Sequence, residues 1–199
     1  KPGSFIEFRL NPNSGAVLDN SKCKLSCKFQ ATAVAGVGAE AYNLFSSPSL
    51  QSAIERITIT VGQNVIEDIT NYNRCYSALS RVYTSDFQTE SAGSLFDLYS
   101  GSGLQNERTA STGKLLNTAS ASPPVANAFE LSIPLSLSSF FGPSSKFAFP
   151  IHAIKEPCFV RIFLSPSVNE LLYSKKADGS IYAFGAGTTY SLSEVSLDV

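Results

Sequence analysis

The chain has 199 residues, 43% of them hydrophobic and only 16% charged, and its acidic and basic residues leave a net charge of −1. An average soluble domain is roughly 25% charged, and low charge with ordinary hydrophobicity argues against a disordered chain. Nucleic-acid binders concentrate positive charge, whereas the densest basic cluster here is Lys22, Lys24 and Lys28, so direct nucleic-acid binding is not expected.

Alternating apolar residues predict the first two strands, over residues 5–10 and about 22–34. Cys23 and Cys27 are four residues apart on the second strand. Their Cα atoms would then be about 13 Å apart, beyond the roughly 7 Å that a disulfide spans and too far for one zinc ion. We therefore expect both thiols to point inward as small apolar groups.

The next segment predicts a hairpin followed by a helix. Residues 54–61 and 65–69 have strand patterns and are separated by Gly62-Gln63-Asn64. Apolar residues then recur at helical spacing, which predicts a helix over about 71–83 with Thr70 or Asn71 as its cap; they are Tyr72, Cys75, Tyr76, Leu79, Val82 and Tyr83.

Residues 84–127 are rich in Ser, Thr, Gly, Asn and Ala, which predicts a long loop excursion on the surface. Residues 129–135 alternate and should end as a strand at Pro134 or lie at a sheet edge. The spacing of Leu137, Phe140 and Phe141 before Gly142-Pro143 predicts a short helix over about 136–141.

The last strands are predicted over 147–154, 158–164 and 190–197. The strand at 158–164 is apolar on both faces apart from Arg161, so we expect it to be central in its sheet. The pattern as a whole predicts an all-β fold: one domain over 1–199, an eight-stranded β-sandwich with Greek-key connections and two short flanking helices.

No catalytic, cofactor-binding or metal-ligating residue is predicted, and we expect the chain not to be an enzyme. The single histidine, His152, falls on a predicted strand and has no predicted partner for acid–base catalysis. Glu67-Asp68 ends a strand before the helix, where Asp68 would favour the positive end of the helix dipole. Gly36-Val37-Gly38 and Gly185-Ala186-Gly187 lack the spacing of a phosphate loop.

The order of three motifs resembles the double jelly-roll major capsid proteins of the adenovirus-like lineage of DNA viruses. The motifs are Ile57–Gly62 with Ile66–Asn73, Leu131–Leu135 with Phe140–Gly142, and Phe149–Ile154 with Val160–Leu164. In the family these look like the strands and flanking helix of the first, N-terminal jelly roll. Only one roll is present, so the chain would be either the first half of a longer protein, with a second roll beyond Val199, or a single-roll capsid protein that needs a partner.

The resemblance implies a structural protein that forms trimeric, pseudo-hexagonal capsomers of an icosahedral shell, located in the virion capsid and assembled inside the host cell. Its partners would be copies of itself, neighbouring capsomers and minor capsid proteins, with no cofactor. No apolar run is as long as the roughly 18 residues of a membrane span. The low fraction of charged residues agrees with a capsid subunit whose sides are buried against neighbouring subunits.

Two other readings stay open. A carbohydrate-binding jelly-roll module would present an aromatic platform; the tyrosines at 72, 76, 83, 99, 173, 182 and 190 offer rings, but the chain has no tryptophan. A sandwich-fold enzyme of the cupin type would need a metal held largely by histidines, and the chain has one.

Overall fold

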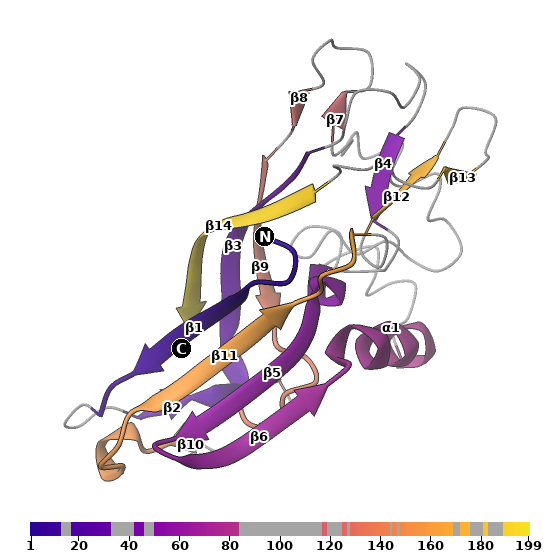
Figure 1. Ribbon diagram of the computed structural model, residues 1–199. Coiled ribbons are helices and arrows are strands. Elements are labelled where there is room, and N and C mark those ends of the chain that lie inside the picture. Colours follow the sequence, from indigo (N-terminus) through magenta and orange to yellow (C-terminus); the bar gives the residue numbers. More distant parts are fainter. Residues whose placement is uncertain are drawn as a thin grey trace.

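The computed structural model describes residues 1–12, 17–32, 42–45, 50–83, 117–118, 125–126, 128–143, 145–146, 148–168, 172–175, 181–182 and 189–199. Most of these residues lie in strands that pair antiparallel. The predicted all-β sandwich is confirmed, and Figure 1 shows its two main sheets as two layers.

The first main sheet has four strands in the order β1 (Phe5–Leu10), β11 (Cys158–Leu164), β5 (Ile54–Val61) and β6 (Asn64–Thr70). β11 lies between β1 and β5, so the prediction that residues 158–164 form a central strand is confirmed. A two-residue turn joins β5 to β6, and its Gly62 has a φ of 58°, the conformation that favours glycine at the start of such a hairpin turn.

The second main sheet has three strands in the order β14 (Thr189–Asp198), β3 (Lys24–Thr32) and β9 (Ala128–Pro134). β9 is an edge strand and ends at Pro134, as predicted from the missing backbone donor of proline. The register of β14 against β3 shifts between Ser193 and Ser196, and Glu194 within this bulge has a φ of 51°. Natural edge strands commonly carry such bulges.

The remaining elements are short. β2 (Leu18–Asp19) pairs with β10 (Ala148–Phe149), β12 (Leu172–Lys175) pairs with both β4 (Tyr42–Phe45) and β13 (Ile181–Tyr182), and β7 (Asn117–Thr118) pairs with β8 (Val125–Ala126). The 3₁₀ helices are η1 (Asn20–Lys22), η2 (Leu50–Ala53) and η4 (Ile151–Ala153). β7 and β8 fall within the predicted excursion at 84–127, whose other residues lie outside the described part of the chain.

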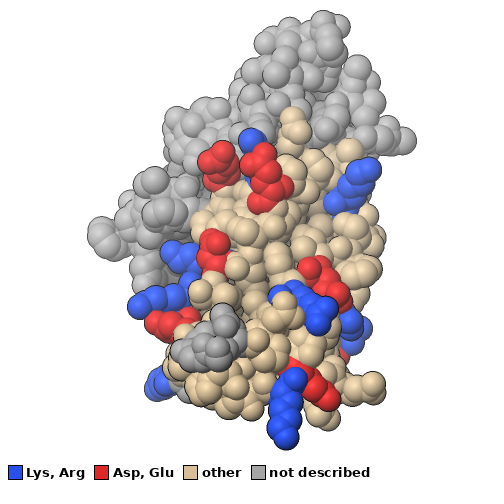
Figure 2. Space-filling view, turned by 90° about the vertical axis from the view of Figure 1, so that its left-hand side faces the viewer, with Lys and Arg blue, Asp and Glu red and all other residues tan. Residues whose placement is uncertain are grey.

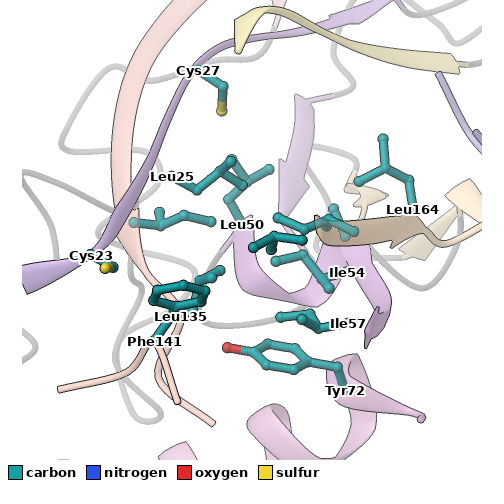
Figure 3. Packing of buried hydrophobic residues seen from close by; sticks show 14 of the residues in the cluster. Cys23, Leu25, Cys27, Leu50, Ile54, Ile57, Tyr72, Leu135, Phe141 and Leu164 are labelled. Carbon is teal, nitrogen blue, oxygen red and sulfur yellow. The ribbon is translucent and has the colours of Figure 1, made fainter. Parts of the chain in front are cut away.

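The core fills the space between the two main sheets and extends to the first turns of the helix α1 (Tyr72–Tyr83) (Figure 3). β3 and β9 bury every second residue from one side, and β11 does so from the other, where β5 buries Ile54 and the run Ile57–Ile59. The most deeply buried side chains of these strands are Leu25, Phe29, Ile133, Ile54, Ile57, Ile59, Cys158, Val160 and Ile162. In β3, β9 and β11 the period of two in the sequence is therefore the pattern of burial.

The apolar stripe of α1 is buried only near its beginning. Tyr72 and Tyr76 are buried with their rings stacked at 6.4 Å. Leu79 and Val82 remain 42% and 75% exposed. The helix predicted over 71–83 is confirmed, and it begins at Tyr72 because Asn71 takes a left-handed φ of 53° before the first turn.

The short helix predicted over 136–141 is wrong: these residues form turns and bends. Gln51 Oε1 accepts from Ser136 N, Tyr72 Oη from Leu137 N and Glu67 Oε1 from Ser139 N, at 3.2, 3.3 and 2.7 Å. Ser138 N donates to Leu135 O at 3.0 Å, which closes a turn of the backbone. The helical spacing of the apolar residues here therefore reflects a buried turn that distant side chains hold in place.

The strand predicted over 147–154 is also wrong over most of its length. Only β10 forms a strand, and Pro150 leads from it into η4. Pro150 fixes its own φ at −78° and its carbonyl accepts from Ala153 N at 2.9 Å, which closes a 3₁₀ turn.

Candidate functional site

The residues with catalytic potential do not gather in one place. His152 lies in η4 with an exposed side chain. Within the described part of the chain, no three His, Cys, Asp or Glu side chains lie close enough to hold a metal ion. Nor is any helix of the described residues long and apolar enough to cross a membrane.

Three of the four cysteines are buried thiols, and only Cys75 on α1 is exposed. Cys23 and Cys27 point into the core, as predicted from their spacing. Burial raises the pKa of Cys23 and of Cys158 to about 11, and the negative charge of Asp19 adds to the effect at Cys23. The thiolate is the reactive species, so these two thiols act as packing groups at neutral pH.

Asp68 makes an ion pair across the sheet, a role that the prediction for this residue did not include. Arg56 donates from Nε to Oδ1 at 2.7 Å and from Nη2 to Oδ2 at 2.6 Å. These hydrogen bonds hold the pKa of the Asp68 carboxyl below its usual value. In the hairpin of β5 and β6, Asp68 lies opposite Thr58, so Arg56 reaches the carboxylate diagonally across the two strands.

The neighbouring Glu67 points the other way and binds the turn after β9. Its Oε2 accepts from Ser138 Oγ at 2.5 Å, and its Oε1 accepts from the N and Oγ of Ser139 at 2.7 and 2.6 Å. Ser138 Oγ in turn accepts from Phe141 N at 2.9 Å. The paired carboxylates therefore have separate structural roles on opposite faces of β6.

The strongest candidate for an interaction site is the outer face of the four-stranded sheet. We call it the arginine–phenylalanine face; it consists of Phe5, Glu7 and Arg9 of β1, Phe159, Arg161 and Phe163 of β11, Arg56 of β5 and Asp68 of β6. The register places Glu7 opposite Arg161 and Phe5 opposite Phe163. Residues from both ends of the chain thus form one surface.

Rings and guanidinium groups alternate across this face. Phe159 contacts two cations, Arg9 at 5.9 Å and Arg161 at 5.8 Å from its ring centre. Phe163 contacts Arg56 at 5.7 Å and the ring of Phe5 at 5.7 Å. Guanidinium groups at these distances are attracted to aromatic faces, so the side chains hold one another in place.

Two ion pairs complete the face. Arg161 Nε donates to Glu7 Oε2 at 2.5 Å, and the second pair is Arg56 with Asp68. All four charged side chains remain 35–44% exposed, and pairs this exposed typically stabilise a fold by only about 0–1 kcal/mol. Phe5 is 60% exposed. Folding stability alone therefore explains little of why these residue types gather here.

Figure 2 shows the left-hand side of the molecule as drawn in Figure 1, where β1 and β14 lie. Charges of both signs are interspersed on this side. No large area of this side carries one sign alone. A surface of this kind lacks the concentrated positive field of a generic nucleic-acid binder.

The second sheet carries a shallow depression of about 400 Å³. It is lined by Ser26, Cys27, Lys28, Glu130, Leu131, Ser132 and Glu194. Lys28 Nζ lies 3.3 Å from Glu194 Oε1, and Ser26 Oγ donates to Asp198 Oδ2 at 2.5 Å. The lining offers hydroxyl and charged groups, and none of these lining residues is aromatic.

The tyrosines that could have formed a sugar platform have other roles where the structure describes them. Tyr72, Tyr76 and Tyr190 are buried, and Tyr190 Oη donates to Ser165 O at 2.8 Å. Tyr173 and Tyr182 lie in β12 and β13. Tyr99 and the side chains of Tyr83, Tyr173 and Tyr182 lie outside the described residues.

Sequence reasoning missed the arginine–phenylalanine face, although a signal for it was present. The alternation in residues 5–10 and 158–164 places Phe5, Glu7 and Arg9 on one face and Phe159, Arg161 and Phe163 on another. What the sequence does not state is that β1 and β11 are neighbours and that these two faces are the same surface.

No protein-family model matches the chain, and no curated protein matches it significantly.

Proposed function

We propose that the chain is a structural protein of a viral capsid, whose β-sandwich assembles into trimeric, pseudo-hexagonal capsomers of an icosahedral shell. It would act in the virion after assembly inside the host cell, beside neighbouring capsomers and minor capsid proteins. The resemblance of its motif order to the double jelly-roll capsid proteins and the two-layer sandwich both support this proposal.

The observation that carries the proposal is the arginine–phenylalanine face. Aromatic residues and arginine are enriched in protein–protein interfaces and supply most of their binding energy. Here three phenylalanines and three arginines line one sheet face, and two of the arginines are already neutralised by Glu7 and Asp68. A neighbouring subunit could cover this face without burying those two guanidinium groups unpaired, which would otherwise be costly.

The alternative of a carbohydrate-binding module has less support. The depression near Lys28 and Glu130 has the volume of a small-ligand site, but its lining residues provide no ring on which a sugar could stack. A glycan array with the purified protein tests this alternative directly: measurable sugar binding would favour it over a capsid role.

The capsid proposal is tested by the assembly state of the complete gene product. Light scattering coupled to gel filtration should give the mass of a trimer or a larger assembly, and negative-stain electron microscopy should show capsomers or particles. Replacing Phe159 by serine removes the ring that contacts two arginines and should shift the distribution toward monomer.

The matched control is Val82→Ser, which removes an apolar side chain that is 75% exposed on α1, away from the sheet face. It should leave the assembly unchanged. A wild-type protein that stays monomeric at high concentration contradicts the capsid proposal. If Phe159→Ser and Val82→Ser behave alike in an assembling protein, the arginine–phenylalanine face is not the interface.

A further inference from the structure

The free edge of β1 differs from the other edges of the two main sheets. β6 and β14 each have a register shift against their neighbour, and β9 ends in a proline. Shifts of this kind and prolines are devices that prevent an edge strand from pairing further. β1 pairs with β11 in one unbroken register over all six residues, and no described strand pairs with its other edge.

The hydrogen bonds of β11 show which backbone groups of β1 are free. Leu164 N donates to Ser4 O on the β1 side, whereas Ser165 N donates to Ala53 O on the other side. In antiparallel sheets the direction alternates from residue to residue. The even-numbered residues of β1 therefore bond to β11, and Phe5, Glu7 and Arg9 direct their N–H and C=O groups toward the open edge.

We propose that this edge binds β1 of a second copy of the chain, antiparallel across a two-fold axis, with Glu7 of each copy opposite Arg9 of the other. The two four-stranded sheets would then join into one continuous sheet. A two-fold contact uses the same patch on both copies, so the patch must be complementary to itself.

The charges select this register. On the open edge of β1 only odd-numbered residues have free backbone groups. An odd-numbered residue of one copy must therefore lie opposite an odd-numbered residue of the other, so the possible registers differ by steps of two residues. Centring the contact on Glu7 would place two carboxylates opposite each other, and like charges in cross-strand pairs are destabilising. Moving the centre to Phe8 replaces that repulsion with two Glu7–Arg9 pairs, one on each side of the axis.

The side chains are free to make these pairs. Arg9 contacts the Phe159 ring, and among the described residues no carboxylate forms an ion pair with it. Glu7 uses Oε2 for Arg161 and is 36% exposed. Its other carboxylate oxygen is available to the partner's arginine, and a carboxylate can accept several hydrogen bonds.

Disulfide trapping tests the register in a Cys75→Ser background, which removes the exposed native thiol. Residues directly opposite as a hydrogen-bonded pair have Cα atoms about 5.5 Å apart, within the range that a disulfide spans. A mixture of Glu7→Cys and Arg9→Cys proteins should therefore form a covalent dimer under mild oxidation, with one Glu7–Arg9 ion pair intact. Either protein alone should link far less, since its two cysteines would be about 7–8 Å apart on the diagonal.

Sedimentation velocity over a concentration series provides the second measurement. Arg9→Glu replaces two attractions by two repulsions and should weaken this self-association about tenfold or more. Lys24→Glu changes the net charge equally on β3 and should have no effect. Circular dichroism verifies that both variants are folded.

Failure of the mixture to cross-link, equal cross-linking by Glu7→Cys alone, or equal effects of Arg9→Glu and Lys24→Glu would overturn the two-fold pairing. This inference rests on the geometry of β1 and not on the capsid proposal. If the protein forms trimers but the mixture of Glu7→Cys and Arg9→Cys proteins does not cross-link, the two-fold pairing is rejected and the capsid proposal is unaffected.

Discussion

Replacing Glu67 by alanine should destabilise the fold far more than its place on an edge strand would indicate. This carboxylate accepts three hydrogen bonds from the turn that follows β9. It lies on β6, so it connects the edge of one main sheet to the turn that leaves the other. No covalent or backbone ladder contact joins these two segments directly.

The magnitude follows from the burial of the donors. Ser138 is 1% exposed, and leaving a buried hydroxyl without its acceptor costs about 1–3 kcal/mol, with hydrogen bonds to charged groups at the upper end. Ser139 is exposed, so its N–H and hydroxyl can turn to water and add less. We expect Glu67→Ala to lower the free energy of unfolding by about 3 kcal/mol.

Urea unfolding followed by circular dichroism measures this change; with a slope of about 2–3 kcal/mol per molar, the midpoint should fall by about 1–1.5 M. The control is Glu55→Ala, an exposed glutamate on β5, which should stay within about 0.5 kcal/mol of wild type. A double-mutant cycle with Ser138→Ala should give a coupling of about 1–2 kcal/mol. Equal midpoints for Glu67→Ala and Glu55→Ala would refute the role of the carboxylate.

Three further predictions concern other parts of the fold. The lowered pKa of Asp68 means that its ion pair stabilises the protein above the ordinary value of 3.8 and loses this effect as the pH falls through the folded-state pKa. The stability difference between wild type and Asp68→Asn should therefore shrink in urea titrations below about pH 4, and Arg56→Gln should abolish this pH dependence. Gly142→Ala should cost about 2 kcal/mol or more in the same assay, because a Cβ there would lie 2.1 Å from the backbone oxygen of Ser138; a smaller loss would show that the turn can open. A chromogenic thiol reagent should react quickly with Cys75 alone, since the other three thiols are buried, and rapid reaction of a second thiol in the native protein would contradict that packing.

Strands such as β1 and β3 could be predicted from the sequence because each has one more buried and one more exposed face. In β1 and β3, every second residue enters the core, and that alternation is visible in the chain itself. The position of Pro134 also predicted where β9 ends, because proline cannot donate to the ladder.

The turn over residues 136–143 could not be predicted because its hydrogen bonds come from distant side chains. Gln51, Glu67 and Tyr72 bind its backbone from 65 to 85 residues away along the chain. The apolar residues of this segment are buried in a pattern that a helix would also produce. Periodicity reports which residues are buried, and it does not report which groups satisfy the backbone.

The arginine–phenylalanine face depends on strand order, which local patterns do not contain. Glu7 and Arg161 are 154 residues apart in the chain and meet because β1 and β11 are neighbours in the sheet. The edge of β1 depends on topology in the same way, since its backbone groups are free only because β1 is the outermost strand. Both candidate surfaces therefore required the fold to be known first.

Glu7 connects the two surfaces. On the sheet face it holds Arg161, which lies over Phe159. In the proposed two-fold contact its other carboxylate oxygen would bind Arg9 of a second copy. Arg9 of the same chain also lies over that ring. Pairing of two β1 edges would draw Arg9 toward the partner's carboxylate and remove one of the two cations that contact Phe159. The two-fold contact would thus change the sheet face that we propose for subunit assembly, so the two contacts should be energetically coupled.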